Sequence, residues 1–372
     1  MEERAALVGV ITRHSQHIDH DQALEELEGL ALAAGARVAL KMVQERPKPD
    51  AATFIGSGKV LSLAKACDEA GVDVVIFDNE LSPAQLRNLE TELSRKVLDR
   101  TQLILDIFAR RARTREGKLQ VELAQLQYLM PRLVGSSEAL SRLGGGIGTR
   151  GPGETKLETD RRRIRHRIAN LKRDIGDVSR RRAHLRERRE KNAQPTVALV
   201  GYTNAGKTTL FNLLTSSNAV ASNALFVTLD PLIRRVRIDD GRQLLLSDTV
   251  GFIDRLPHQL VAAFHATLEE VAAADLLLHV IDGSAHDIER REEAVRAVLR
   301  EVDADKVPRI DVINKIDLIE PEALERLRYM RPDAVFISAA KGKGRGELLE
   351  AVAARLEEQL PRWTARRKVL SA

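Results

Sequence analysis

The chain has 372 residues, of which 43% are hydrophobic and 30% charged, with a formal net charge of +5. This length suggests two or three domains and is ample to bury a core. Aromatic residues make up only 3%, which argues against base stacking on many rings as the main means of recognition. The single cysteine, Cys67, excludes internal disulfides, and no apolar run approaches the length of a membrane span. We therefore expect a cytoplasmic protein.

Residues 1–114 alternate short apolar runs with stretches of helical periodicity. The runs at 6–12, 36–44 and 72–78 predict buried strands, and 96–99 is a candidate fourth strand. Helical spacing falls at 20–35, 58–71 and 82–95 between them. This alternation predicts a small parallel α/β domain. The GSGK stretch at 56–59 resembles half of a phosphate-binding loop, but a helix-starting turn is the favoured interpretation.

Residues 115–194 change to heptad spacing. Apolar residues recur at this spacing over 119–133 and again over 157–185, which predicts an antiparallel two-helix coiled-coil hairpin. Pro131 predicts a kink or a break in the first helix. The glycine-rich residues 142–154 cannot hold a helix and are expected to form the tip loop of the hairpin.

The hairpin also carries the positive charge of the chain. Residues 131–194 hold 18 Lys and Arg against 8 Asp and Glu, whereas the remainder is net negative. Such asymmetry points to a polyanionic partner, against the alternative of a solvated coiled-coil face. The RNA-binding candidates in this segment are Arg142, Gly145, Arg150, Arg161, Arg162, Arg163 and Arg165.

Residues 195–360 have the pattern of a P-loop domain with a doubly wound, mostly parallel sheet, followed by a basic tail at 361–372. The motif GYTNAGKT at 201–208 stands between a predicted strand and a predicted helix, the context in which backbone N–H groups surround phosphates. Lys207 is expected to reach the β- and γ-phosphates. The Thr208 hydroxyl is expected to bind Mg²⁺.

Two further segments complete the predicted phosphate end. Thr228 lies 20 residues beyond Thr208 and suits a mobile segment that closes over Mg²⁺ and the γ-phosphate. In DTVG at 248–251, Asp248 would hold Mg²⁺ through water and the Gly251 N–H would sense the γ-phosphate. Phe252 stands where many GTPases place a water-orienting glutamine. We therefore expect slow hydrolysis that depends on a partner.

The base is assigned to NKID at 314–317 and SAAK at 338–341. Asp317 can accept hydrogen bonds from N1–H and the 2-amino group of guanine, which adenine lacks. The nucleotide-binding candidates are Gly201, Tyr202, Thr203, Asn204, Ala205, Gly206, Lys207, Thr208, Thr209, Phe226, Val227, Thr228, Asp248, Thr249, Val250, Gly251, Asn314, Lys315, Asp317, Ser338, Ala339 and Ala340. Of these, Lys207, Thr228, Gly251 and Asn204 are the catalytic candidates, and Thr208, Thr228 and Asp248 the metal ligands.

With these residues in place, nearly the whole chain resembles the HflX family within the Obg-HflX group of GTPases. The resemblance rests on FIGSGKV, QVELAQLQYLMPRL, GGGIGTRGPGETKLETDRRRIRHRI, GYTNAGKTTLFN and DTVGFIDRLPHQLVAAFHATLEEV. It implies a GTPase that binds the large ribosomal subunit, is stimulated by the ribosome, and splits stalled or idle ribosomes under stress. Asn204 resembles the asparagine of potassium-activated GTPases, which implies K⁺ beside Mg²⁺. A monomer is expected.

Two departures from the family pattern and two alternatives accompany this resemblance. Little chain remains beyond Leu360, where many relatives carry a further domain, and Leu232 and Ile233 stand where polar residues are expected. The alternatives are an RNA-modifying GTPase and a non-ribosomal signalling or scaffold GTPase whose coiled coil binds protein.

Overall fold

The computed structural model describes residues 2–11, 24–133, 152–191, 194–217, 225–238, 241–254 and 270–360, with residues 260, 268 and 363. For 152–157 and 181–191 it describes the backbone alone. The chain forms two compact units. Unit 1 contains residues 1–110 and 118–173, and unit 2 contains residues 111–117 and 174–372. None of the described helices is long and apolar enough to cross a bilayer.

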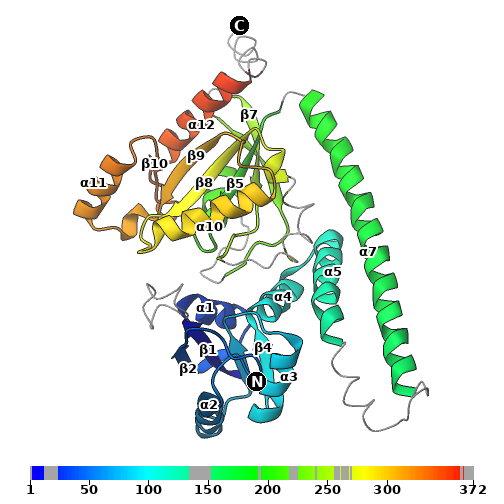
Figure 1. Ribbon diagram of the computed structural model, residues 1–372. Coiled ribbons are helices and arrows are strands. Elements are labelled where there is room, and N and C mark those ends of the chain that lie inside the picture. Colours follow the sequence, from blue (N-terminus) through cyan, green and yellow to red (C-terminus); the bar gives the residue numbers. More distant parts are fainter. Residues whose placement is uncertain are drawn as a thin grey trace. The chain divides into compact units, whose positions relative to one another are not determined.

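Unit 1 is built on a four-stranded parallel sheet of order β2-β1-β3-β4 (Figure 1). Its strands are β1 (Arg4–Ile11), β2 (Arg37–Glu45), β3 (Val74–Phe77) and β4 (Lys96–Asp99). The predicted parallel sheet is therefore confirmed, including its fourth strand. Helices α2 (Ser57–Ala70) and α3 (Pro83–Leu93) share one apolar core with the strands, in which Cys67 is fully buried.

Local sequence explains how these helices begin. The GSGK stretch starts α2, as expected, with Gly56 as its N-cap residue. Helix α3 begins with a capping box in which the Ser82 hydroxyl accepts from the Gln85 N–H and the Gln85 side chain accepts from the Ser82 N–H. Helix α1 (Glu25–Ala33) and helix α4 (Arg100–Arg111) complete the unit. Helix α4 was not predicted, although Leu103, Ile104, Ile107 and Phe108 are buried along it.

The two helices of the predicted hairpin are α5 (Arg115–Arg132) and α7 (Pro152–Lys191). Pro131 lies inside helix α5, whose last residue is Arg132, so the helix does not break before this proline. Within unit 1, α5 and α7 run antiparallel (Figure 1), and Arg167 of α7 forms two hydrogen bonds to the Glu122 carboxylate of α5, at 2.6 and 2.7 Å. Tyr128 of α5 is buried and donates to Asp99 at the end of β4, at 2.8 Å.

Unit 2 contains a six-stranded sheet of order β10-β9-β8-β5-β7-β6, in which only β6 is antiparallel to its neighbour. The strands are β5 (Thr196–Gly201), β6 (Leu232–Arg237), β7 (Gln243–Asp248), β8 (Leu276–Asp282), β9 (Arg309–Asn314) and β10 (Val335–Phe336). The predicted mostly parallel, doubly wound sheet is thus confirmed. Strand β6 was not predicted, and it explains why Leu232 and Ile233 are apolar.

Helices cover both faces of this sheet (Figure 1). Helices α8 (Lys207–Thr215) and α12 (Arg345–Gln359) share one core with the strands, and the only tryptophan of the chain, Trp363, is buried in that core. Helices α10 (Ile288–Glu301) and α11 (Pro321–Met330) lie against the other face, where Leu327 packs with Ile281 and Ile313. The carboxyl ends of β5, β7, β8 and β9 meet at one edge of the sheet.

Candidate functional site

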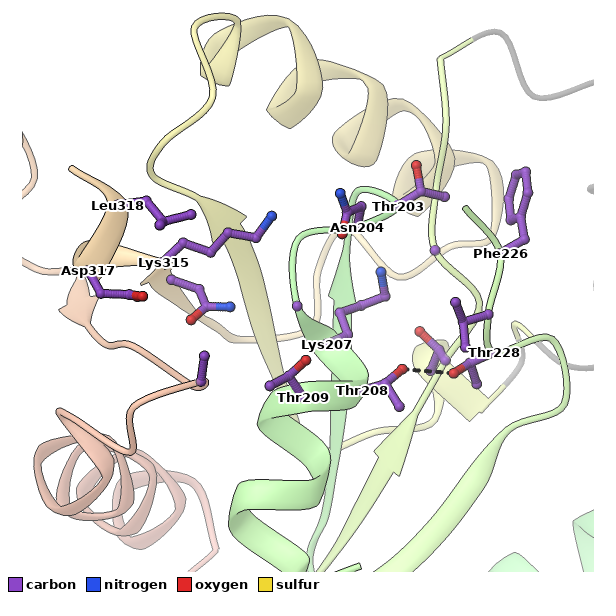
Figure 2. Close-up of a pocket in the computed structure, with 16 residues that line it drawn as sticks. Thr203, Asn204, Lys207, Thr208, Thr209, Phe226, Thr228, Lys315, Asp317 and Leu318 are labelled. Carbon is purple, nitrogen blue, oxygen red and sulfur yellow. Dashed lines mark hydrogen bonds between the residues drawn. The ribbon is translucent and has the colours of Figure 1, made fainter. Parts of the chain in front are cut away.

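A pocket lies at this edge, where open α/β sheets bind their ligands (Figure 2). It is lined by Thr203, Asn204, Gly206, Lys207, Thr208, Thr209, Phe226, Val227, Thr228, Thr249, Gly251, Asn314, Lys315, Asp317, Leu318 and Ala340. Of these, only Leu318 was not among the nucleotide-binding candidates. The pocket therefore brings together segments that are far apart in the sequence.

The first segment is the turn between β5 and α8. Asn204 and Gly206 adopt positive φ angles of 60° and 93°, so the turn exposes its backbone N–H groups before the helix begins. A Cβ on Gly206 would lie 2.2 Å from Nδ2 of Asn314, so only glycine allows this approach. Lys207 is buried, and its Nζ donates to the carbonyl oxygens of Gly201 at 3.1 Å and Tyr202 at 2.8 Å.

The charge of Lys207 is set by its burial. Desolvation lowers the pKa of this lysine to about 8, and the Asp248 carboxylate only partly opposes the shift. An anion placed beside Nζ would stabilise the charged form of this lysine and raise its pKa again. The site is consequently suited to phosphate.

Three oxygen-bearing side chains converge next to Lys207. The Thr208 and Thr228 hydroxyls lie 2.8 Å apart, and each donates to Oδ2 of Asp248, at 2.8 and 3.0 Å. The other carboxylate oxygen, Oδ1 of Asp248, is buried and has no hydrogen-bond partner among the described residues. Burial raises the pKa of Asp248, although Lys207 and the two threonines oppose the shift. Hydroxyl and carboxylate oxygens are the ligands that Mg²⁺ prefers, so this donor set fits a magnesium ion.

The DTVG segment lies directly over the turn. Phe252 and the turn exchange backbone hydrogen bonds, from Thr203 N–H to Phe252 O at 2.7 Å and from Phe252 N–H to Gly201 O at 3.1 Å. A Cβ on Gly251 would meet Cγ2 of Thr203 at 2.9 Å and Nζ of Lys207 at 3.0 Å. The Phe252 ring is 1% exposed and does not line the pocket. It therefore does not point at the phosphate position.

The opposite end of the pocket is held by Asn314 and Ser338. Asn314 is buried; its Nδ2 donates to Ala205 O at 2.8 Å and its Oδ1 accepts from Ala339 N–H at 3.0 Å. The Ser338 hydroxyl donates to Oδ1 of Asp317 at 2.5 Å. This hydrogen bond lowers the pKa of Asp317, which is solvent-exposed and lines the pocket. An ionised carboxylate is thus available at this end.

One positioning contact was missed from the sequence. Lys315 Nζ donates to Oδ2 of Asp282 at 2.7 Å, so the lysine stem is held along the pocket wall. Ser284 donates to the other oxygen of the same carboxylate through both its N–H, at 3.0 Å, and its hydroxyl, at 2.6 Å. The position of Asp282 at the carboxyl end of a buried strand is the signal that would have identified it.

The remaining candidates fall into three groups. Gly201, Tyr202, Ala205, Asp248, Val250, Ser338 and Ala339 lie in the same segments as the lining residues without lining the pocket themselves. Arg142, Gly145 and Arg150 lie outside the described residues. Arg161, Arg162, Arg163 and Arg165 lie on α7.

The exposed arginines of α7 differ in their partners. Arg163 lies 3.6 Å from Asp160, and Arg167 pairs with Glu122. Arg162 and Arg165 are exposed, and no carboxylate among the described residues pairs with either. These two guanidinium groups are therefore available to an external anion.

Comparison with known proteins agrees with this arrangement. Family models described as GTP-binding GTPase N-terminal, GTP-binding GTPase Middle Region and 50S ribosome-binding GTPase match residues 21–109, 111–189 and 196–315. GTPase HflX of Caldanaerobacter subterraneus subsp. tengcongensis is 49% identical over 94% of this chain and 80% of its own length. GTPase HflX of Escherichia coli is 46% identical over 98% of this chain and 85% of its own.

A solved structure is similar as well. The crystal structure of SsGBP in complex with GDP matches with a TM-score of 0.52 and 26% identity, over 95% of this chain and 98% of that one.

Proposed function

This chain belongs to the HflX family of GTPases, and from this membership we propose that it is a ribosome-associated molecular switch in the cytoplasm. It binds GTP or GDP with Mg²⁺ in the pocket of unit 2. In the GTP state it associates with the large ribosomal subunit and splits stalled or idle ribosomes under stress. The observation that carries this proposal is the convergence of Lys207, the oxygen set around Asp248, and Asp317 on one pocket.

The phosphate end of the pocket supports the nucleotide chemistry. Lys207 would exchange its two carbonyl acceptors for the β- and γ-phosphates, which stabilise its charged form. Thr208, Thr228 and, through water, Asp248 would hold Mg²⁺, which neutralises phosphate charge when bound. Thr228 and the Gly251 N–H, which respond to the γ-phosphate, distinguish GTP from GDP.

Guanine selection rests on Asp317, because its ionised carboxylate pairs with two donors that adenine does not have. The test is calorimetric titration of the Asp317→Ala variant with GDP and ADP. A preference of roughly 10⁴-fold for GDP should fall by at least 100-fold, since a site built on such hydrogen bonds discriminates on this scale. The control is Asp333→Ala, an exposed aspartate of the same unit. Undiminished preference in Asp317→Ala would refute the assignment.

Hydrolysis by the isolated chain is proposed to be slow. The buried Phe252 supplies no group that orients water, so a partner must complete the site, and such a partner contributes about 10³ to 10⁵ in rate. Asn204, held at positive φ in the turn, is proposed to help bind K⁺ next to the phosphates. Hydrolysis measured in KCl and in NaCl, with and without large subunits, tests both statements. Equal rates in the two salts would remove the K⁺ site.

Ribosome association is proposed to use the basic hairpin. The exposed Arg162 and Arg165 can neutralise RNA phosphates, which makes binding salt-dependent. Co-sedimentation of the GTP-analogue complex with large subunits should weaken in Arg162→Glu/Arg165→Glu. The dependence of log K on log salt should fall by about 1.5, because each phosphate contact contributes about 0.7–0.9. Lys306→Glu/Arg326→Glu, which reverses two exposed charges in unit 2, serves as the charge-matched control. Unchanged salt dependence would place the interface elsewhere.

A further inference from the structure

A contact within unit 2 joins residues 226–230, here called the switch segment, to the start of helix α5. Residues 111–117 belong to the same compact unit as the pocket. The Asp230 carboxylate accepts hydrogen bonds from the backbone N–H groups of Arg113 and Thr114, both at 2.9 Å, and from the Thr114 hydroxyl. The sequence separation across this contact is 116 to 117 residues.

The same contact completes the N-terminus of α5. Oγ1 of Thr114 accepts from the Gly117 N–H at 3.0 Å, so Thr114 caps the helix while it donates to Asp230. A Cβ on Gly117 would lie 2.3 Å from Oδ1 of Asp230 and 3.2 Å from Oγ1 of Thr114. Glycine at this position is what allows the carboxylate to approach the helix.

Asp230 is two residues from Thr228, which contacts the Mg²⁺ ligands Thr208 and Asp248. Two extended residues span at most about 7 Å, so the position of Asp230 depends on where Thr228 is held. Leu229, which lies between Thr228 and Asp230, is 3% exposed, and Phe226, which precedes Thr228, is 2% exposed. The burial of these two side chains holds the segment in this conformation. A nucleotide that moves Thr228 must therefore also move Asp230.

Helix α5 continues from unit 2 into unit 1 at residue 118. In unit 1 it is tied to the sheet by Tyr128 and Arg132, which bond to Asp99 at 2.8 and 3.1 Å, and to α7 through Glu122 and Arg167. The first turn of α5 is thus the point at which the switch segment contacts the helix that carries the hairpin.

We propose that Asp230 is a positioning residue that, in the GTP-bound state, binds the switch segment to the first turn of α5. The nucleotide in the pocket thereby controls whether the switch segment contacts this helix of the hairpin. The inference rests on the proposed nucleotide function. It makes Thr114 and Gly117 part of the switch although neither lines the pocket. Loss of the γ-phosphate releases Thr228, and with it the three hydrogen bonds of Asp230.

The first test compares affinities of the full chain for GDP and for a non-hydrolysable GTP analogue, both with Mg²⁺. If the Asp230 contact is made only in the GTP-closed state, as proposed, Asp230→Ala should lower the ratio of analogue affinity to GDP affinity by at least about fivefold, the lower end of measured coupling between sites. Thr114→Val, which leaves the two backbone donors in place, should lower it less. GDP affinity itself should stay unchanged.

Gly117→Ala provides a sharper variant, because alanine normally stabilises a helix relative to glycine. Here it should lower the affinity ratio as well, since its methyl group displaces the Asp230 carboxylate. The matched control is Gly346→Ala in α12, where no described atom lies within 4 Å of the added Cβ. Trp363 fluorescence verifies that unit 2 of each variant is folded.

Hydrogen exchange of the Arg113 and Thr114 amides gives an independent readout. Both amides should be more protected with the GTP analogue than with GDP, and Asp230→Ala should abolish the difference. Equal protection in the two wild-type complexes, or an unchanged affinity ratio in Asp230→Ala, would overturn the inference while leaving guanine-nucleotide binding intact. Failure of the wild-type chain to bind guanine nucleotides would instead refute the proposed function.

Discussion

Asn314 should stabilise unit 2 even without nucleotide. Truncating it to alanine leaves two buried backbone groups, Ala205 O and Ala339 N–H, without partners. Each such group costs about 1–3 kcal/mol, and allowing for partial replacement by water we expect a loss of about 2–4 kcal/mol in the free energy of unfolding. Urea unfolding followed by Trp363 fluorescence measures this directly. With an m-value of about 2–3 kcal/mol/M, the midpoint should fall by roughly 1 M.

A second variant and a control test this explanation for the loss of stability. Asn314→Asp keeps the acceptor for Ala339 N–H but loses the donor to Ala205 O, so it should still cost at least about 1 kcal/mol. Asn88→Ala is the control, because the Asn88 amide donates to Ala52 O at an exposed site of unit 1. Its effect on the Trp363 transition should be negligible. A midpoint shift below about 0.2 M in Asn314→Ala would refute the argument that this side chain braces the pocket.

Three further outcomes are expected. At pH 8.5, GDP binding should take up about three-quarters of a proton, because Lys207 has a pKa of about 8 that bound phosphate raises. The affinity for GDP should therefore fall as the pH rises above 8. Calorimetry in buffers of different ionisation enthalpy measures the proton uptake, and a value of zero would contradict this prediction. Gly251→Ala should weaken GTP-analogue binding at least about tenfold in a fluorescent-nucleotide titration, with a smaller effect on GDP, since its Cβ would crowd Thr203 and Lys207; equal effects would contradict this. Tyr128→Phe should lower the stability of unit 1 by about 1.5–3 kcal/mol in urea unfolding monitored by circular dichroism, because Asp99 loses a buried donor, and a change below 0.5 kcal/mol would contradict it.

Much of the fold was accessible from sequence because its signals are local. Buried parallel strands are continuous apolar runs, and the turn at 201–208 is identified by the spacing of its glycines between a strand and a helix. Strand β6 escaped prediction because its sequence LIRRVR carries three arginines on an edge strand. Helix α4 escaped because its dense apolar residues continue directly from β4 without a turn signal.

The candidate site also contains residues that local motifs identify and residues that they do not. Lys207, Thr208, Asp248 and Asp317 lie in short motifs whose residue types follow from phosphate, metal and guanine chemistry. Asp230 and its partner Thr114 are far apart in the sequence, and neither residue type is unusual at its position. Only the folded chain brings them together. Contacts of this kind, which connect a motif to the rest of the molecule, were beyond prediction from spacing.

The burial of Cys67 has a practical consequence. Its thiol is the only one in the chain, lies in the core of unit 1, and has a pKa raised by desolvation. A thiol-modifying reagent should therefore label Cys67 in the native protein only as fast as unit 1 opens, whereas the fluorescence of Trp363 reports the opening of unit 2. Without any engineered label, the chain permits the opening rates of its two units to be timed separately in a single sample, with each nucleotide bound.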